Sequence, residues 1–462
     1  MKKLNTMDAS WLMVESRETP MHVANLAIFS LPKDASDDFV QQLVARAKAS
    51  KDFVSPWNLR LRGGALGKVA PAWVEDNDID MDYHFRHSAL PKPGGERELG
   101  ILVSRLHSHQ LDFGRPPWEC HIIEGLENNR VALYVKMHHS LIDGVSGARM
   151  LQRLFSPDSE KRNMPAPWSV PEPKKDTSAA AQASPMDAAT ESLKSKTNGS
   201  TGSLFKALRT LVKAGRDPND PLTPPFAAPK SILNKRVKSP RRFATQQYDL
   251  ALIKKLAKAA DCSLNDIVLY LCSTALRRFL KEANQLPTQS LTAGIPVNIR
   301  AKDDMGTGNA ISFIMANLGT DIADSLKRLE VIKASTNRAK EHLQSLPKSA
   351  LTQYTMLVMA PYMLQLISGL GGIAKPVFNV TISNVPGPDQ TLYYNGARLE
   401  AMYPVSLIAH GGAINITCLS YAGTLNFGYT GCRDTLPHMQ RIAVYTGEAL
   451  DELSQLLRIK KG

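Results

Sequence analysis

The chain has 462 residues, of which 43% are hydrophobic and 21% charged, a composition typical of a globular protein rather than a disordered one. Its length predicts two or three domains. The formal net charge of +13 favours an anionic partner, either a phosphate-rich ligand or an anionic membrane surface. Aromatic residues make up only 6%, and no pattern of a nucleic-acid-binding module is present, so we expect no nucleic-acid partner.

The N-terminal segment does not resemble a targeting signal. It begins Met1-Lys2-Lys3, but Asp8 and Glu15 interrupt it before any long apolar run, so we expect no secretory signal. The five cysteines are scattered without a CxxC pair, which favours reduced thiols and a cytoplasmic location.

The first region, 1–164, alternates predicted strands with predicted helices. A strand is expected over 22–31, a helix over 37–49, and a hairpin from 118–126 and 130–138. Helices mixed with hairpins predict an α/β fold of the α+β type, with mixed or antiparallel sheets covered by helices.

The hairpin ends in the run His138-His139-Ser140-Leu141-Ile142-Asp143-Gly144, which is followed by a predicted helix over 143–155. A neutral imidazole can remove the proton of a hydroxyl group at neutral pH, so the run is a candidate catalytic site. Side chains alternate along a strand, which places His139 on the apolar face and His138 on the other. A structural histidine pair, half of a metal site, and Asp143 as a helix N-cap are the alternatives.

A linker is predicted over 165–230, because prolines are followed there by Ala, Ser, Thr and Lys in abundance. Within it, Ser203 to Ala214 forms an amphipathic helix that either docks on a domain or lies in an anionic membrane surface. Its predicted apolar face consists of Leu204, Phe205, Leu208, Leu211 and Val212.

The second region, 231–462, again mixes both kinds of element. Helices are expected over 263–283 and 324–346, strands over 291–299 and 376–383, and a hairpin from 413–421 and 424–430. The uncharged stretch Ser349 to Ala374 contains Pro361, and we expect a buried, proline-broken helix pair that lines an apolar pocket rather than a membrane span.

Candidate site residues in this region begin at the predicted helix 263–283. Ser263 and Asp266 match a capping box, and Asn265 beside them is a candidate donor to developing negative charge. Arg300 ends a strand and is either a surface residue or a bidentate partner of Asp143.

Other motifs contribute less. Asn384 and Pro386 belong to a strand that enters a rigid proline turn, although many such turns only connect elements. The pairs His84/His87 and His107/His109 have spacings that could reach a metal, but no Cys or carboxylate pattern supports one. We therefore expect these histidines to be exposed to solvent, and no metal site.

Several of these motifs together resemble the motif set of the bacterial wax ester synthase/acyl-CoA:diacylglycerol acyltransferase family. The resemblance covers almost the whole chain except the linker, and the sequence looks especially like enzymes of marine wax-accumulating bacteria. One departure is visible, since the family usually has Pro-Leu-Trp where this chain has Pro-Pro-Trp. The matching segments are 8–12, 20–23, Pro116-Pro117-Trp118, His138 to Gly144, Asn265-Asp266-Ile267 and Asn384-Val385-Pro386.

The resemblance implies two chloramphenicol-acetyltransferase-like lobes with mixed sheets and a substrate tunnel between them. It implies transfer of a long-chain acyl group from acyl-CoA, a substrate rather than a cofactor, to a fatty alcohol or diacylglycerol. His139 would be the general base, His138 a supporting residue, Asp143 a structural residue that orients the loop, and Asn265 a candidate oxyanion donor.

Substrate-binding or scaffold roles would fall to Gly144, Trp118, Asp266, Arg300, Asn384 and Pro386. The expected location is cytoplasmic, with peripheral association to the inner membrane or to lipid inclusions, and the oligomeric state stays open. Two rival hypotheses are a non-catalytic lipid-binding protein and a condensation-type amide synthase on the same fold.

Overall fold

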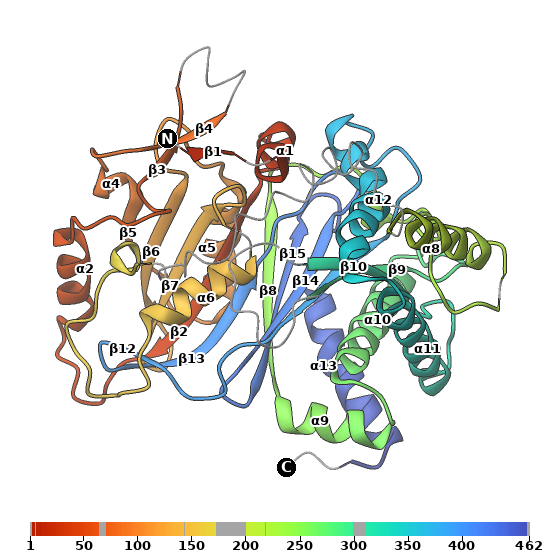
Figure 1. The fold of residues 1–462 in the computed structure, drawn as a ribbon. Helices are drawn as coiled ribbons and strands as arrows, with labels where there is room; N and C mark the ends of the chain where they lie inside the picture. The colour runs from red at the N-terminus through yellow and green to blue at the C-terminus, as the bar shows by residue number, and fades with distance from the viewer. Residues whose placement is uncertain are drawn as a thin grey trace.

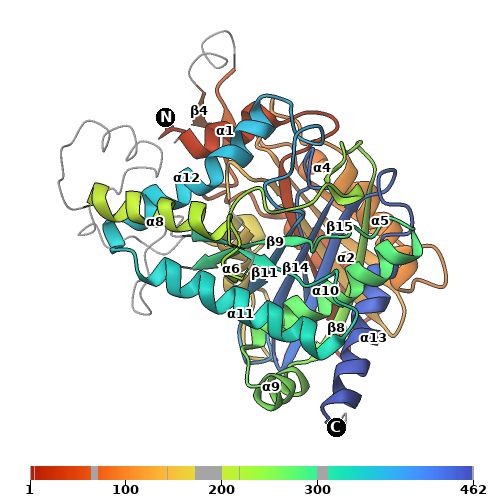
Figure 2. The same ribbon diagram turned by 90° about the vertical axis from the view of Figure 1, so that its right-hand side faces the viewer.

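The computed structural model describes residues 2–4, 6–63, 71–142, 144–171, 200–217, 219–298 and 311–459. Two six-stranded sheets stand next to each other, with helices packed on their faces, and a small three-stranded sheet lies near the N-terminus (Figure 1). Figure 2 shows the same arrangement from the side that carries most of the C-terminal helices. The predicted mixed α/β class with two mixed sheets is confirmed.

The strands of the three sheets have the following bounds. The N-terminal sheet contains, in spatial order, β12 (Tyr393–Tyr394), β13 (Ala397–Val405), β2 (His22–Ser30), β7 (Arg130–His138), β6 (Trp118–Leu126) and β5 (Phe85–Ala89). The C-terminal sheet contains β10 (Ile311–Asn317), β9 (Thr292–Asn298), β11 (Val380–Val385), β14 (Ile414–Tyr421), β15 (Thr424–Cys432) and β8 (Arg241–Asp249). The small sheet contains β1 (Lys2–Lys3), β4 (Ala72–Glu75) and β3 (Leu59–Leu61).

The helices are divided between the two regions in the same way. The N-terminal ones are α1 (Thr6–Val14), α2 (Phe39–Ala49), α4 (Met81–His84), α5 (Glu96–Ser108), α6 (Gly144–Leu154) and the short η1 (Pro167–Ser169). The later ones are α8 (Ser200–Ala214), η2 (Ile232–Asn234), α9 (Leu250–Ala259), α10 (Leu264–Glu282), α11 (Ser325–Gln344), α12 (Lys348–Ile367) and α13 (Arg441–Leu456).

Strand β7 is buried on both faces, and this position decides where the histidine run lies. Its alternate residues Leu133, Val135 and Met137 share an apolar cluster with α6 and with buried tryptophans. Ala132 and Tyr134 point the other way, into a cluster with α5. The strand continues in register with β2 up to the pair His22–His138.

The N-terminal sheet contains two strands from the C-terminal region. Strand β13 pairs antiparallel with β2, and β12 pairs with β13 at the sheet edge. A division at 164 and 231 therefore does not separate the two sheets by residue number. The β13–β2 pairing joins the two regions through a backbone hydrogen-bond ladder.

Helix α12 differs from the predicted helix pair. It is one helix of 20 residues with Pro361 inside it. Proline removes the bond to the carbonyl four residues earlier, that of Leu357, but Leu357 is 46% exposed, so water can satisfy this carbonyl. One side of α12 lines a small apolar pocket through Tyr354 and Val358, whereas other apolar residues face solvent.

Helix α8 docks on the protein. Ala207, Leu211 and Ala214 are buried in the C-terminal core, and the helix packs against α12. Phe205 and Val212, which were predicted on the apolar face of this helix, point outward and are exposed. Within the described ranges, no helix is both long enough and apolar enough to cross a bilayer.

Candidate active site

His139 follows strand β7 directly and is held by the N-terminal segment. Its backbone N–H donates a hydrogen bond to the Met21 carbonyl at 2.8 Å. Its ring lies against the Trp11 indole of α1, with ring centroids 4.5 Å apart and planes tilted by 39°. The residue is only partly buried, so the imidazole is oriented by these contacts while part of its surface stays accessible.

His138 is the deeply buried member of the pair, with 1% of its surface exposed. The alternation of side chains along the strand predicted that the His139 side chain points into the apolar interior. The structure differs because both faces of β7 are covered and the strand ends at His138, which leaves His139 in the following loop.

The two ring nitrogens of His138 have neighbours on opposite sides. Nδ1 lies 2.6 Å from Ser140 Oγ and accepts the backbone N–H of Ser140 at 3.2 Å. A neutral ring that accepts at Nδ1 carries its proton on Nε2, which lies 3.5 Å from the carboxylate of Glu15. Glu15 also accepts the backbone N–H of Met21. Glu15 and Met21 thus contact the two histidines, and the ring of His138 is buried among these protein groups.

The Pro-Pro-Trp segment contacts the histidine run through its backbone. The Pro117 carbonyl accepts the N–H of His138 at 3.0 Å. Proline in place of the usual leucine removes a backbone N–H but keeps this carbonyl acceptor. Trp118 is fully buried, donates Nε1–H to the Trp57 carbonyl at 2.7 Å, and stacks with Trp168. It pairs with Met137 near the end of β7.

Lys136, two residues before His138 on β7, belongs to a cluster of buried charged side chains that sequence reasoning missed. Lys136 Nζ lies 3.0 Å from Glu119 Oε2 and also donates to the carbonyls of Leu106 and His109, at the end of α5. The side chain of Lys136 is 0% exposed. Burial would raise the pKa of Glu119, but His121 and Lys136 outweigh it and hold this pKa at about 2.

The expectation of solvent-exposed histidines is wrong for two of the four. His84 and His107 are each 1% exposed. His84 stacks on Trp118, and His107 lies within hydrogen-bonding distance of Tyr134 Oη, 2.9 Å away. Burial, together with the charges of Lys136 and Arg241, lowers the pKa of His107 to about 3. Both rings are therefore enclosed by protein groups rather than by solvent.

Ser263 and Asp266 form the predicted capping box of α10. The Asp266 carboxylate accepts the N–H of Ser263 at 2.9 Å and the hydroxyl of Thr336 at 2.6 Å. Asn265 is partly buried in the first turn of this helix. Helix α10 packs against α9, α11 and α13 on the C-terminal side, whereas the described neighbours of His139 come from the N-terminal segment.

Asn384 and Pro386 lie at the end of β11, where the chain turns close to β14. Asn384 Oδ1 is 3.4 Å from the Cys418 thiol, one of five free cysteines, and Pro386 is exposed. Gly387 donates its N–H to Ser420 Oγ at 3.1 Å. A Cβ on Gly387 would lie 2.2 Å from the Ser420 carbonyl oxygen, so only glycine fits this close approach.

Three further predicted site residues are Asp143, Gly144 and Arg300. Asp143 and Arg300 lie outside the described residues, and their ion pair stays a prediction. Gly144 begins α6, and a Cβ added there would meet no atom within 4 Å. Packing among the described residues therefore does not require glycine at this position.

The two glycines give a paired prediction. We expect Gly387→Ala to lower the free energy of unfolding by about 1–3 kcal/mol, because the new methyl group collides with backbone. Gly144→Ala should leave it unchanged or raise it by up to about 1 kcal/mol, because alanine favours the helix. Urea unfolding measures both values, and a loss of equal size in the two variants would contradict the expectation.

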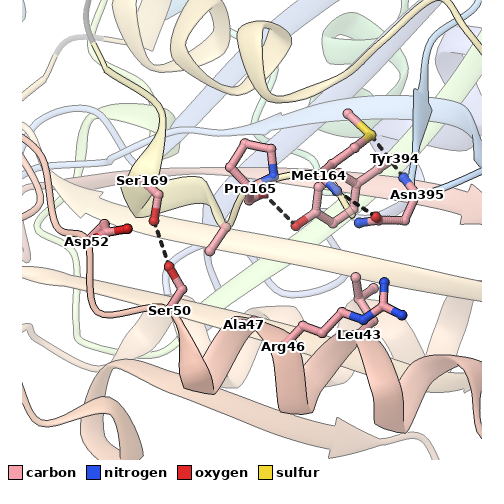
Figure 3. A pocket seen from close by; sticks show the side chains of 11 residues that line it. Leu43, Arg46, Ala47, Ser50, Asp52, Met164, Pro165, Ser169, Tyr394 and Asn395 are labelled. Carbon is pink, nitrogen blue, oxygen red and sulfur yellow. Dashed lines mark hydrogen bonds between the residues drawn. The ribbon is translucent and has the colours of Figure 1, made fainter. Parts of the chain in front are cut away.

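A cavity of about 210 Å³ lies on the N-terminal side between α2 and the segment around η1 (Figure 3). In its lining, the hydroxyls of Ser50 and Ser169 are hydrogen-bonded to each other at 2.8 Å, and Tyr394 donates to the Pro165 carbonyl at 3.0 Å. His139 does not line this cavity. A tunnel between the lobes that reaches His139 stays a prediction.

The fold is shared with solved structures of low sequence identity. The first condensation domain of the calcium-dependent antibiotic synthetase matches with a TM-score of 0.57 and 13% identity over 99% of this chain and 96% of its own, a likeness of fold alone.

Comparison with other sequences identifies the family. The wax ester synthase/diacylglycerol acyltransferase catalytic domain matches residues 4–268, and the C-terminal domain of the same family matches residues 307–454. The chain belongs to this family and is an acyltransferase.

Individual relatives agree over nearly the full length. A putative diacylglycerol O-acyltransferase of Mycobacterium tuberculosis is 46% identical over 98% of this chain and 97% of its own. The O-acyltransferase WSD of Acinetobacter baylyi is 39% identical over 97% of this chain and 96% of its own. The wax ester synthase/diacylglycerol acyltransferase of Marinobacter aquaeolei VT8 matches in structure with a TM-score of 0.78 and 36% identity, over 99% and 100% of the two chains.

Proposed function

We propose that this acyltransferase moves a long-chain acyl group from acyl-CoA to the hydroxyl group of a fatty alcohol or of diacylglycerol. The observation that carries the proposal is the placement of His139, which is oriented by Trp11 and Met21 yet partly accessible. The names of the relatives describe wax ester synthesis and diacylglycerol acylation, and both reactions need the same proton transfer.

In the proposed mechanism His139 accepts the proton of the acceptor hydroxyl. The hydroxyl oxygen forms the new ester bond at the thioester carbonyl carbon, and the carbonyl oxygen becomes an oxyanion. The carbon–sulfur bond then breaks, and the CoA sulfur takes the proton back from His139. General-base help of this kind contributes about 10²–10⁴ in rate. The mechanism uses direct attack in a ternary complex, without a covalent acyl-enzyme.

Asn265 is proposed as an oxyanion donor, supported by its place in the first turn of α10, whose N-terminal amides and dipole favour negative charge. We expect Asn265→Ala to lower kcat by about 10²-fold with an unchanged KM, the usual cost of losing one such donor. Steady-state thiol release measures both constants. An unchanged kcat would remove Asn265 from the mechanism and leave the capping box as the reason for this motif.

The remaining residues are proposed to support the loop and the lobe junction. Asp143 would hold the loop through an ion pair with Arg300, while Gly144 would leave room above the start of α6. Trp118 and Asp266 serve as scaffold in this proposal, on the contacts described above.

The test of the proposed function uses the purified full chain with palmitoyl-CoA and either hexadecanol or diacylglycerol. We expect release of free CoA thiol together with the corresponding ester, with at least one acceptor. No release with either acceptor would favour the lipid-binding hypothesis, and product formation only with an amine acceptor would favour the amide synthase.

We also propose a cytoplasmic location with peripheral association to the inner membrane or to lipid inclusions. The formal net charge of +13 supports attraction to an anionic surface. The acceptors proposed here are themselves lipids, which concentrate at such surfaces.

A further inference from the structure

Three helices at one side of the molecule form a continuous surface. Helix α12 packs against α8 on one flank and against α1 on the other, and both views show the three side by side (Figures 1 and 2). Helix α1 carries Trp11, the residue that stacks on His139. The surface therefore adjoins the candidate active site.

Among the described residues, seven large apolar side chains are exposed on α8, on α12 and in the turn after α12. Leu364 on α12 is 66% exposed, Ile373 in the turn after α12 is 61% exposed, and Phe205 on α8 is 70% exposed. The apolar part of the surface, here called the α8/α12 face, consists of Phe205, Val212, Leu357, Leu364, Ile367, Leu370 and Ile373. Exposed apolar patches of this kind mark interaction sites.

The charges on the same segments have one sign. Residues 200–216 and 348–375 contain no Asp or Glu, whereas the outward side of α8 carries Lys206, Arg209 and Lys213. Arg216 and Lys375 are exposed at the ends of these segments. Apolar side chains between cations fit the boundary between anionic headgroups and acyl chains.

We infer that the α8/α12 face docks on an anionic phospholipid surface, with its apolar side chains in the headgroup boundary and its cations on the phosphates. The inference rests on the peripheral association proposed above and names the face that makes it. The docked faces of α8 and α12 stay buried in the protein core, so binding needs no unfolding of either helix. The acceptor lipid would then lie on the side of the molecule where α1 holds His139.

The test measures binding of the full chain to vesicles of phosphatidylcholine with and without phosphatidylglycerol, by flotation. We expect the wild type to bind the anionic vesicles and to be released by salt, because exposed charges are screened. Arg209→Glu with Lys213→Glu should weaken binding about tenfold or more. Leu364→Ser with Ile373→Ser should weaken binding to the same vesicles and leave its salt dependence in place.

The matched control carries the same apolar-to-serine change on other faces. Ile101 on α5 and Val444 on α13 are 52% and 53% exposed, and Ile101→Ser with Val444→Ser should bind like the wild type. Circular dichroism checks that all variants are folded. Binding by the α8/α12 variants equal to that of the control would overturn the inference alone. A wild type that binds neither kind of vesicle would overturn the proposed peripheral association as well. Thiol release with a water-soluble short-chain alcohol tests the proposed acyl transfer separately.

Discussion

His139→Ala should lose CoA thiol release by about 10²-fold to 10⁴-fold while the protein stays folded. The loss follows because no other described side chain at the end of β7 offers an accessible imidazole, since His138 is buried with Nδ1 bonded to Ser140. The fold should survive because His139 is only partly buried and its backbone bond to Met21 does not need the side chain.

The measurement is thiol release under saturating palmitoyl-CoA, with thermal unfolding of the same preparation. His87→Ala is the matched control, because His87 is a partly exposed histidine on β5 whose ring faces Glu124 instead of the site. Full activity in a folded His139→Ala protein would exclude the proposed mechanism.

Lys136→Met should lower the free energy of unfolding by up to about 3–5 kcal/mol, because it removes the nearest cation from the buried Glu119 carboxylate and leaves Arg86, at 3.9 Å, as the remaining one. It also leaves the carbonyls of Leu106 and His109 without their donor. The double variant Lys136→Met with Glu119→Gln should recover part of this loss, since it removes the buried charge that has lost Lys136. Urea unfolding of the four proteins gives the coupling between the two side chains, and a single Lys136→Met variant as stable as the wild type would contradict the prediction.

The pH dependence of the same pair has a defined sign. Folding lowers the pKa of Glu119 from its ordinary 4.5 to about 2, so the unfolded chain binds the proton more readily. The stabilisation by this carboxylate is therefore fully present above about pH 4.5 and is lost as the pH falls towards about 2. In Lys136→Met, His121 and Arg86 still favour the charged carboxylate, so the pKa of Glu119 should rise from about 2 towards its ordinary value, and that variant should lose less stability on acidification than the wild type.

Local patterns predicted the central hairpin with its observed bounds. Strands β6 and β7 begin and end where the alternation does, and Asn128 and Asn129 between them adopt positive φ angles, which asparagine tolerates well. The capping box of α10 was predicted for the same reason, because its two hydrogen bonds join residues only three apart. Strand 376–383 was less well placed, since β11 runs from Val380 to Val385.

The sequence by itself determined the family, the mixed α/β class and the identity of the histidine run, because these depend on residue types at short spacings. Tertiary structure alone decided which histidine is accessible and what holds it. Met21, Trp11 and Glu15 reach the run from more than a hundred residues away, and β13 joins the N-terminal sheet from the other end of the chain. A local pattern contains no information on such distant partners. The burial of Lys136 and the exposure of Phe205 could therefore be seen only in the tertiary structure.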